Sequence, residues 1–270
     1  MPVVRVDDPA DPRLADYARL SDAELLRARQ LFVAEGRLVV ERVIADPAFN
    51  LRSVLLSEAA HRALQPLLAR LAAATPIYVI AAGDFLPLTG FNIHRGCLAL
   101  VERPPARSAA ALAQGARTLV VLEAVTNADN VGGVFRNAAA FQGDGVLLSP
   151  TCCDPLYRKA VRTSMAATLQ VPFARLEAWP GELSMLKASG FTLVALTPRG
   201  GSTTLDEFSA GPRPGRIAIL VGTEGAGLSA AAEAIADHRV RIPISNRVDS
   251  LNLAVATGIA LSRLSLGRPL

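Results

Sequence analysis

The sequence predicts an α/β protein of two domains, the second of which is built on a mostly parallel sheet. The chain has 270 residues, of which 51% are apolar and 19% charged, so it has the length for one or two domains and enough apolar material for a folded core. Short apolar runs alternate with helical patterns in its second part. A stretch with two prolines, residues 103–117, precedes that part.

The first hundred residues predict a small α/β domain. The apolar runs LRSVLLS (51–57), PIYVI (76–80) and GCLALVE (96–102) have the length and composition of strands. Residues 36–45 and 58–74 show the apolar spacing of helices. Helices and strands of this size are sufficient for a domain with its own core.

The linker is predicted at residues 106–117, between an N-terminal domain of residues 1–105 and a C-terminal domain of residues 118–270. This stretch is rich in small and polar residues and has no strand pattern. The C-terminal domain contains five apolar runs with the length of strands, at residues 118–125, 145–150, 192–197, 217–222 and 240–244. Helical segments separate them, which indicates a mostly parallel sheet covered by helices.

The sequence also indicates where in the cell the protein acts and whether it holds a metal. No apolar stretch reaches eighteen residues and the start lacks the apolar run of a signal peptide, so we expect a soluble, cytoplasmic protein that does not enter a membrane. Cys97, Cys152 and Cys153 lack the spacing of a disulfide framework or a zinc site, which favours reduced thiols. The histidines are scattered, so no metal is expected.

The net charge of +4 permits nucleic-acid binding without demanding it. Acidic and basic residues balance in residues 1–105, so the whole excess lies in the C-terminal part.

Three segments of the C-terminal part carry small or polar residues where a strand gives way to a helix, the place where open α/β sheets bind ligands. The first is NADNVGGVFRNA (127–138). Asn130 can cap the helix, and the pair Gly132 and Gly133 permits close approach of another chain. Arg136 falls on the helical face of Gly132. The alternative is a capped helix with a solvated arginine.

The second segment is LVGTEGAGLS (220–229), in which three glycines surround Glu224. Such a turn exposes main-chain groups that can hold a polar cofactor, or it simply ends a strand. Residues 225–230 also fit a G-x-G-x-x-A dinucleotide fingerprint with Asp249 downstream, but too little chain follows for a full dinucleotide fold.

The third segment is IPISNRVDSLNLAVATGIALSRL (242–264), where SLN opens an apolar helix rich in alanine and glycine. Ser250 is either a functional residue or the helix N-cap. Asn252 is harder to explain by packing. The small residues of the helix permit close packing against the sheet or against a second subunit.

Together, N-x-x-N-x-G-x-x-x-R-N-A, VGTEGAGLS and IP-x-x-x-x-x-x-SLN-x-A-x-A resemble, in order and spacing, the three motifs of the SpoU family of RNA ribose 2′-O-methyltransferases, part of the SPOUT superfamily. The resemblance covers residues 118–266. FVAEGRLVVERVI (32–44) and GFNIHRGCLALVE (90–102) resemble the substrate-binding domain that often precedes this catalytic domain. Met165 and Ala166 stand where relatives commonly show a glycine nearby.

This resemblance implies a C-terminal SPOUT domain with a deep trefoil knot, preceded by a small α/β RNA-binding domain. It implies S-adenosylmethionine as cofactor, structured RNA as substrate, and a homodimer whose active site takes residues from both subunits. The family's catalytic arginine corresponds to Arg136, and its other active-site positions to Asn130, Glu224, Ser250 and Asn252. Cofactor contacts correspond to Leu196, Thr197, Gly222, Ile242 and Leu251.

Folded RNA would be held through its phosphates, for which Arg136 and five other residues are the candidates: Arg37, Arg95, Arg158, Lys159 and Arg162. Arg42 and His94 are further candidates in the first domain. A solvated helix face is the alternative for residues 158–162. Ribosomal RNA is favoured over transfer RNA because of the additional N-terminal domain.

The residue types fit the chemistry. A ribose hydroxyl is a poor nucleophile, so its deprotonated form must be stabilised and held in line with the methyl donor. Since arginine stays protonated, we expect Arg136 to stabilise the developing alkoxide and to anchor the adjacent phosphate. Asn130, Ser250 and Asn252 would orient the ribose and the guanidinium. The alternatives are a transfer-RNA 2′-O-methyltransferase, a catalytically silent RNA-binding protein of this fold, and a nucleotide-dependent oxidoreductase.

Overall fold

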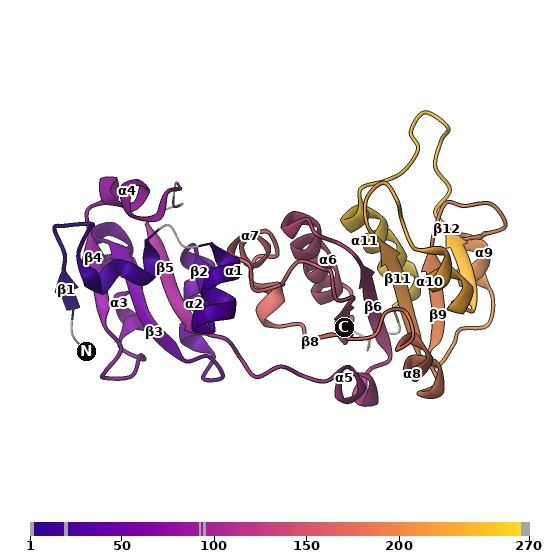
Figure 1. Cartoon of the computed structure of the whole chain (residues 1–270), viewed down its shortest axis with the longest axis horizontal. Coiled ribbons are helices and arrows are strands. Elements are labelled where there is room, and N and C mark those ends of the chain that lie inside the picture. The colour runs from indigo at the N-terminus through magenta and orange to yellow at the C-terminus, as the bar shows by residue number, and fades with distance from the viewer. Residues whose placement is uncertain (1–2, 19–20, 92, 94–95, 266–270) are drawn as a thin grey trace. The chain divides into compact units, whose positions relative to one another are not determined.

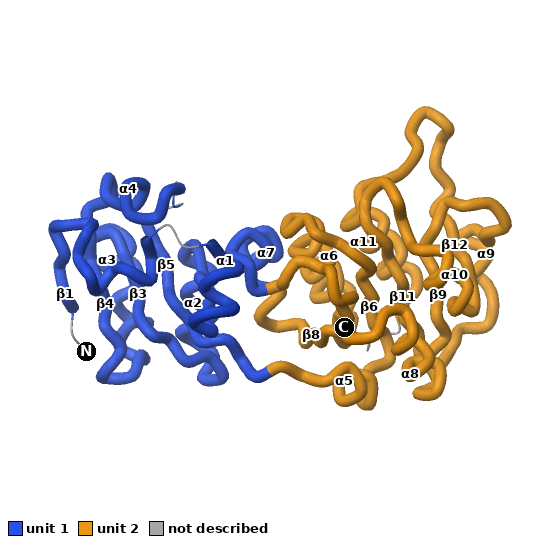
Figure 2. Tube along the Cα trace, in the orientation of Figure 1, with its two compact units in different colours: residues 1–105, 156–166 blue, residues 106–155, 167–270 orange. Residues whose placement is uncertain are grey.

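The computed structural model of the chain describes residues 3–18, 21–91, 93 and 96–265. The chain divides into two compact units, coloured separately in Figure 2. Unit 1 consists of Met1–Pro105 and Leu156–Ala166, and unit 2 of Ala106–Pro155 and Ala167–Leu270.

Unit 1 contains a mixed sheet, which has five strands within the described residues (Figure 1). The strands are β1 (Val3–Arg5), β2 (Leu31–Glu35), β3 (Leu51–Ser57), β4 (Ile77–Ile80) and β5 (Cys97–Glu102), in the order β1-β4-β3-β5-β2. The pairs β1–β4 and β4–β3 are parallel, whereas β5 runs antiparallel to both β3 and β2. The three strands predicted in this region are confirmed, and β1 and β2 are additional.

Both faces of this sheet are covered. The helices of unit 1 are α1 (Asp22–Glu24), α2 (Arg37–Ala45), α3 (Glu58–Leu68), α4 (Phe85–Thr89) and α7 (Arg158–Thr163), with 3₁₀ turns at Pro12–Tyr17 and Ala82–Asp84 and a π-helical turn at Leu25–Arg29. Helices α2 and α3 pack together on one face. On the other face Leu14, Leu25 and Phe85 close a core over Leu55 and Leu98.

The segment that carries α7 belongs to unit 1, although the sequence analysis placed it in the C-terminal domain. The reason is electrostatic. Glu35 ends β2 with a side chain that is 0% exposed, and the guanidinium groups of Arg158 and Arg162 are its partners. A carboxylate buried this deeply needs cationic partners, and α7 provides them.

The loop after α7 takes an unusual backbone path. Met165 and Ala166 have φ angles of 52° and 66°, in the left-handed region that favours glycine. The carbonyl of Met165 accepts a hydrogen bond of 2.7 Å from the guanidinium of Arg42. Glycine would adopt this backbone conformation with less strain than either residue.

Unit 2 is built on a parallel sheet, as predicted, with seven strands within the described residues. They are β6 (Thr118–Glu123), β7 (Gly145–Leu148), β8 (Phe173–Arg175), β9 (Thr192–Leu196), β10 (Thr203–Thr204), β11 (Ile217–Gly222) and β12 (His238–Arg241), in the order β10-β12-β9-β11-β6-β7-β8. Each neighbouring pair is parallel. The five predicted strands are present, although the one predicted at residues 240–244 lies at His238–Arg241.

Helices cover both faces of this sheet (Figure 1). They are α5 (Ala109–Gly115), α6 (Ala128–Ala140), α8 (Leu183–Ala188), α9 (Leu205–Ala210), α10 (Ala230–Ile235) and α11 (Leu253–Leu264), with a 3₁₀ turn at Ala167–Leu169. Apolar side chains of α5, α8 and α10 share one core with alternate residues of the strands. Helices α6 and α11 pack against each other, and against β7 and β11, on the opposite face.

Helix α5 occupies the stretch predicted as a linker. Ser108 caps it by accepting a hydrogen bond from the backbone N–H of Ala111, and Leu112 and Ala113 are buried. Residues 109–115 are therefore part of the core of unit 2, because their alanines and leucine form a helix with one apolar face.

The three cysteines are buried and free, and burial raises the pKa of Cys97 to about 12. No helix in the described part of the chain has the length and apolarity that a bilayer span requires.

Candidate cofactor and active site

A cavity of about 340 Å³ opens where two neighbouring strands of unit 2 end. Leu196 ends β9 and Gly222 ends β11, and the two strands are parallel, so their carboxyl ends lie at the same edge of the sheet. The loop that follows β12 and the start of α11 complete the lining. The volume and position are typical of a small-molecule site in an open α/β sheet.

The glycine turn after β11 shapes one wall of this cavity. A Cβ on Gly222 would lie 2.1 Å from the backbone carbonyl carbon of Gly227, so only glycine fits at the strand end. Gly225 and Gly227 have φ angles of 81° and 70°. A 2.9 Å hydrogen bond from the N–H of Gly227 to the carbonyl of Thr223 closes the turn. The turn therefore lays main-chain groups against the cavity, together with Glu224.

The predicted cofactor-binding residues lie together around this cavity. Its lining includes every one of them: Leu196, Thr197, Gly222, Ile242 and Leu251. Three predicted active-site residues line it as well: Glu224, Ser250 and Asn252. The roles assigned to these residues stay predictions.

Asn252 connects three segments that are far apart in the sequence. Its Nδ2 donates to Oδ1 of Asn130 at 2.9 Å and to Oε1 of Glu224 at 3.2 Å. Its Oδ1 accepts from the backbone N–H groups of Ala254 and Val255, at 3.0 and 3.3 Å. One amide thus caps α11 and ties it to α6 and to the glycine turn.

The cap predicted for α6 was wrong, and of the two interpretations of Ser250 the structure excludes the cap. Asn127, not Asn130, caps α6, by accepting a hydrogen bond of 2.9 Å from the N–H of Asp129. Asn130 lies inside the helix and is buried. Asn252, not Ser250, caps α11, which leaves the exposed Ser250 at the cavity. In both cases two polar residues lie within three positions of each other near the start of the helix. Either could cap it, and the sequence alone does not decide which one does.

Helices α6 and α11 approach each other closely. One of the residues responsible, Asn137, was not predicted from the sequence. A Cβ on Gly133 would lie 2.6 Å from the Cβ of Ala254. Nδ2 of Asn137 donates a 2.6 Å hydrogen bond to the carbonyl of Ala254 and lies against Gly258. Asn137 follows Asn130 by seven residues, which places both on one helical face. That spacing could have identified it.

Arg136 is exposed on α6 and does not line the cavity. Within the described residues its guanidinium forms no hydrogen bond or ion pair. The group is therefore available for an outside partner.

Apart from Arg136 in unit 2, the predicted RNA-binding residues that the structure describes lie in unit 1. Arg37 is exposed and forms an (i, i+4) pair with Glu41 at 3.4 Å. Arg158, Lys159 and Arg162 lie on α7, where the first and third are partners of Glu35. The predictions for Arg95 and His94 fall outside the described residues.

The described part of the chain contains no group of three or more histidine, cysteine, aspartate or glutamate side chains that could hold a metal ion.

Residues 117–262 match the model of the SpoU rRNA Methylase family. The chain belongs to this family. The resemblance inferred from the three motifs is confirmed, and with it the expectation of an RNA methyltransferase. Membership in the SpoU rRNA Methylase family also removes the support for a nucleotide-dependent oxidoreductase.

Several proteins named as RNA methyltransferases are similar along nearly the whole chain. An uncharacterized tRNA/rRNA methyltransferase of Mycobacterium bovis is 44% identical over 259 residues, which span 94% of this chain and 89% of the relative. The AdoMet-bound crystal structure of an rRNA methyltransferase from Sinorhizobium meliloti has a TM-score of 0.80 at 22% identity and covers 97% of each chain. A solved RNA 2′-O ribose methyltransferase has a TM-score of 0.77 at 24% identity, over 97% of this chain and 98% of that one. At these identities the structures show the shared fold.

Proposed function

We propose that this protein transfers a methyl group from S-adenosylmethionine to a ribose 2′-hydroxyl of structured RNA, with ribosomal RNA favoured over transfer RNA. The observation that carries the proposal is the cavity of unit 2, because residues from the second and third sequence motifs line it and Asn252 joins it to the first. Family membership supports RNA methylation. The likeness to a solved RNA 2′-O ribose methyltransferase supports the ribose as acceptor.

The cavity fits S-adenosylmethionine. Leu196, Ile242 and Leu251 offer apolar surface for the adenine ring, and the glycine turn offers main-chain donors and acceptors for its polar edge. The hydroxyl groups of Thr197 and Ser250 can bind the polar remainder. When bound, the cofactor supplies a methyl group on a positively charged sulfur. We infer the deep trefoil knot of the SPOUT fold around this cavity from membership in the SpoU family.

Arg136 provides the charge that the acceptor needs. Its guanidinium stabilises negative charge developing on the 2′-oxygen and binds the neighbouring phosphate. Asn130 and Asn252 fix the edge of the site through their mutual hydrogen bond. Glu224 accepts from the same amide and so limits its rotation. These residues hold and orient the ribose.

The exposed position of Arg136 supports a homodimer. The residue does not line the cavity of its own chain, so a second subunit that completes the site explains its exposure. Val255 is 51% exposed on α11, beside the cavity-lining Ala256, and provides an apolar contact for such a partner. A cytoplasmic location is part of this proposal, and the proposed RNA substrate supports it.

Replacing Arg136 tests this function. We expect Arg136→Ala to lower methyl transfer from labelled S-adenosylmethionine to RNA at least about 100-fold, because a donor aimed at developing charge contributes that much. Cofactor affinity measured by calorimetry should stay within about twofold, since the side chain lies outside the cavity. Arg213→Ala is the matched control, because Arg213 is also exposed in unit 2.

Nucleotide analysis of the product identifies the acceptor. A methylated 2′-oxygen blocks alkaline cleavage, so the product should contain alkali-resistant dinucleotides. Methyl transfer by Arg136→Ala at the parental rate would contradict the assigned role. Absence of S-adenosylmethionine binding by the parent would leave an RNA-binding protein without the reaction, and methylation of purified transfer RNA but not ribosomal RNA would reverse the substrate preference.

A further inference from the structure

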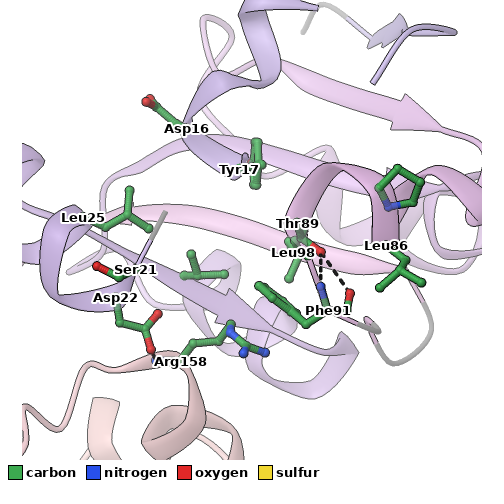
Figure 3. A pocket seen from close by; sticks show the side chains of 13 residues that line it. Asp16, Tyr17, Ser21, Asp22, Leu25, Leu86, Thr89, Phe91, Leu98 and Arg158 are labelled. Atoms are coloured by element: carbon green, nitrogen blue, oxygen red, sulfur yellow. Dashed lines mark hydrogen bonds between the residues drawn. The ribbon is translucent and has the colours of Figure 1, made fainter. Parts of the chain in front are cut away.

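Unit 1 contains a second cavity, of about 830 Å³, that the methyl-transfer site does not use. Figure 3 shows its walls: Asp22 and Leu25 lie on one side, and Thr89 and Phe91 on the other. Leu98 of β5 contributes to the floor. The cavity therefore joins apolar and aromatic surface to a small number of polar groups, the composition of a ligand site.

One wall of this cavity is held rigidly by Arg158. Its guanidinium is hydrogen-bonded to the fully buried carboxylate of Glu35 and lies 3.5 Å from the centroid of the Phe91 ring. Its backbone N–H donates to Oδ2 of Asp22 at 3.0 Å. Three contacts from three separate segments fix one residue. A ligand here meets a preformed surface and loses little affinity to ordering it.

The charges of the cavity exclude a phosphate as its occupant. Asp22 contributes a carboxylate, whereas Asp16 forms an ion pair with Arg29 and Arg158 forms one with Glu35. Asp22 is partly buried, and burial raises the pKa of its carboxyl. Within the described residues, only Oδ2 of Asp22 has a hydrogen-bond partner, so Oδ1 is an acceptor available to a ligand.

A flat molecule with an amino group fits these features. Nucleobases stack on aromatic rings and on guanidinium planes, and carboxylates accept hydrogen bonds from their exocyclic amino groups. Outside the cavity, Arg162 is 47% exposed on α7 and offers a cation to a phosphate.

We propose that the cavity of unit 1 binds one unpaired nucleobase of the RNA substrate, packed against Phe91 and Arg158 with its exocyclic amino group donating to Asp22. This inference rests on the proposed function, which supplies the RNA. Adenine, cytosine and guanine carry such an amino group, and uracil does not. The cavity therefore selects against uracil at one position of the substrate.

Binding of labelled hexanucleotides to the full chain tests the proposal. Fluorescence anisotropy should show that the parent binds hexaadenylate and hexacytidylate about 10-fold more tightly than hexauridylate, as expected for one hydrogen bond to a charged group. Asp22→Asn replaces the carboxylate with an amide that also donates, so it should reduce this preference to less than about threefold. Phe91→Leu should weaken binding of all three about 10-fold by removing the ring.

Two control variants lie outside the cavity. Asp7→Asn and Leu38→Ala change exposed residues of unit 1, and both should bind the hexanucleotides like the parent. Circular dichroism should show that all four variants are folded.

Equal binding of the three hexanucleotides by the parent, or no binding, overturns the proposal, as does parental behaviour of Phe91→Leu. Displacement of the RNA by a lysine-rich peptide more strongly in the parent than in Asp22→Asn would assign the cavity to a basic protein partner instead. Methyl transfer to ribosomal RNA, measured on the same preparations, separates the two proposals. Normal transfer without base preference rejects only the nucleobase site, and base preference without any transfer rejects only the proposed function.

Discussion

At the scale of single residues, Asn252 shows how one side chain can serve stability and function together. Its carbonyl oxygen caps α11, and its amide nitrogen contacts Asn130 and Glu224. An aspartate has the same shape and is an equally good cap, but it has no N–H to donate. The two roles can therefore be separated by one substitution.

We expect Asn252→Asp to keep α11 folded and to lower methyl transfer about 10-fold or more, because the new carboxylate repels Glu224 and loses the hydrogen bond to Asn130. Because the buried Asn130 loses its donor, the free energy of unfolding should fall by about 1–3 kcal/mol. The rate with saturating cofactor and RNA measures the effect on methyl transfer. Asn246→Asp places the same charge in the preceding loop, outside this hydrogen-bond network, and is the control. Equal rates for the two variants would show that the network has no part in the reaction.

At the scale of helices and strands, the contact between α6 and α11 depends on a glycine facing an alanine. Gly133 and Ala254 leave room for one Cβ and not for two. Asn137 holds the same contact through the carbonyl of Ala254. The pair positions Asn252, because Ala254 lies in the first turn of the helix that this asparagine caps.

Exchanging the two residues tests this packing. Gly133→Ala should destabilise the protein by about 1–3 kcal/mol through overpacking, and Ala254→Gly by about 1 kcal/mol through loss of helix propensity. The double variant restores one Cβ at the contact and leaves the summed helix propensity unchanged, so its free energy of unfolding in urea should return close to the parental value. Additive losses in the double variant would show that the two positions do not interact.

The predicted elements differ from the observed ones for identifiable reasons. Residues 51–57 and 217–222 are long apolar runs, and the structure has strands with those bounds. Strands β8 and β10 have three and two residues, too few to show a pattern, and their neighbours in the sheet define them. Helix α5 was interpreted as a linker because its alanines resemble the small residues of a flexible segment. Its burial could not be deduced before the core of unit 2 was known.

At the scale of the whole molecule, the sequence predicted which segments gather at the site better than it predicted where each residue points. Parallel strands end at one edge, so the segments after β9 and β11 had to lie close together. The contact of Asn252 with Asn130 joins residues 122 positions apart, and that of Arg158 with Glu35 spans 123. Nothing in the sequence around these residues indicates that they are partners. Because of the contact between Arg158 and Glu35, residues 156–166 belong to unit 1 and not to the predicted C-terminal domain.

Assembly of two chains is the remaining requirement of the proposed active site, and α11 offers the surface to test it. Its small residues Ala254 and Gly258 face α6 of the same chain, which leaves the exposed Val255 as the candidate contact for a partner. An unpaired carboxylate buried in an interface costs several kcal/mol. Val255→Glu should therefore weaken the dimer at least about 100-fold in sedimentation velocity. Methyl transfer should fall in parallel if both subunits contribute residues to the site.

Val3→Glu places the same charge on a side chain that is 43% exposed on β1 of unit 1, a strand with no residue assigned to RNA, and it should leave both the sedimentation coefficient and the rate unchanged. A parent that sediments as a monomer at the concentrations where it methylates RNA would show that one chain is sufficient. In that case Arg136 must reach the reacting ribose from the surface of its own α6, and the dependence of the rate on Arg136 would persist at any dilution of the enzyme.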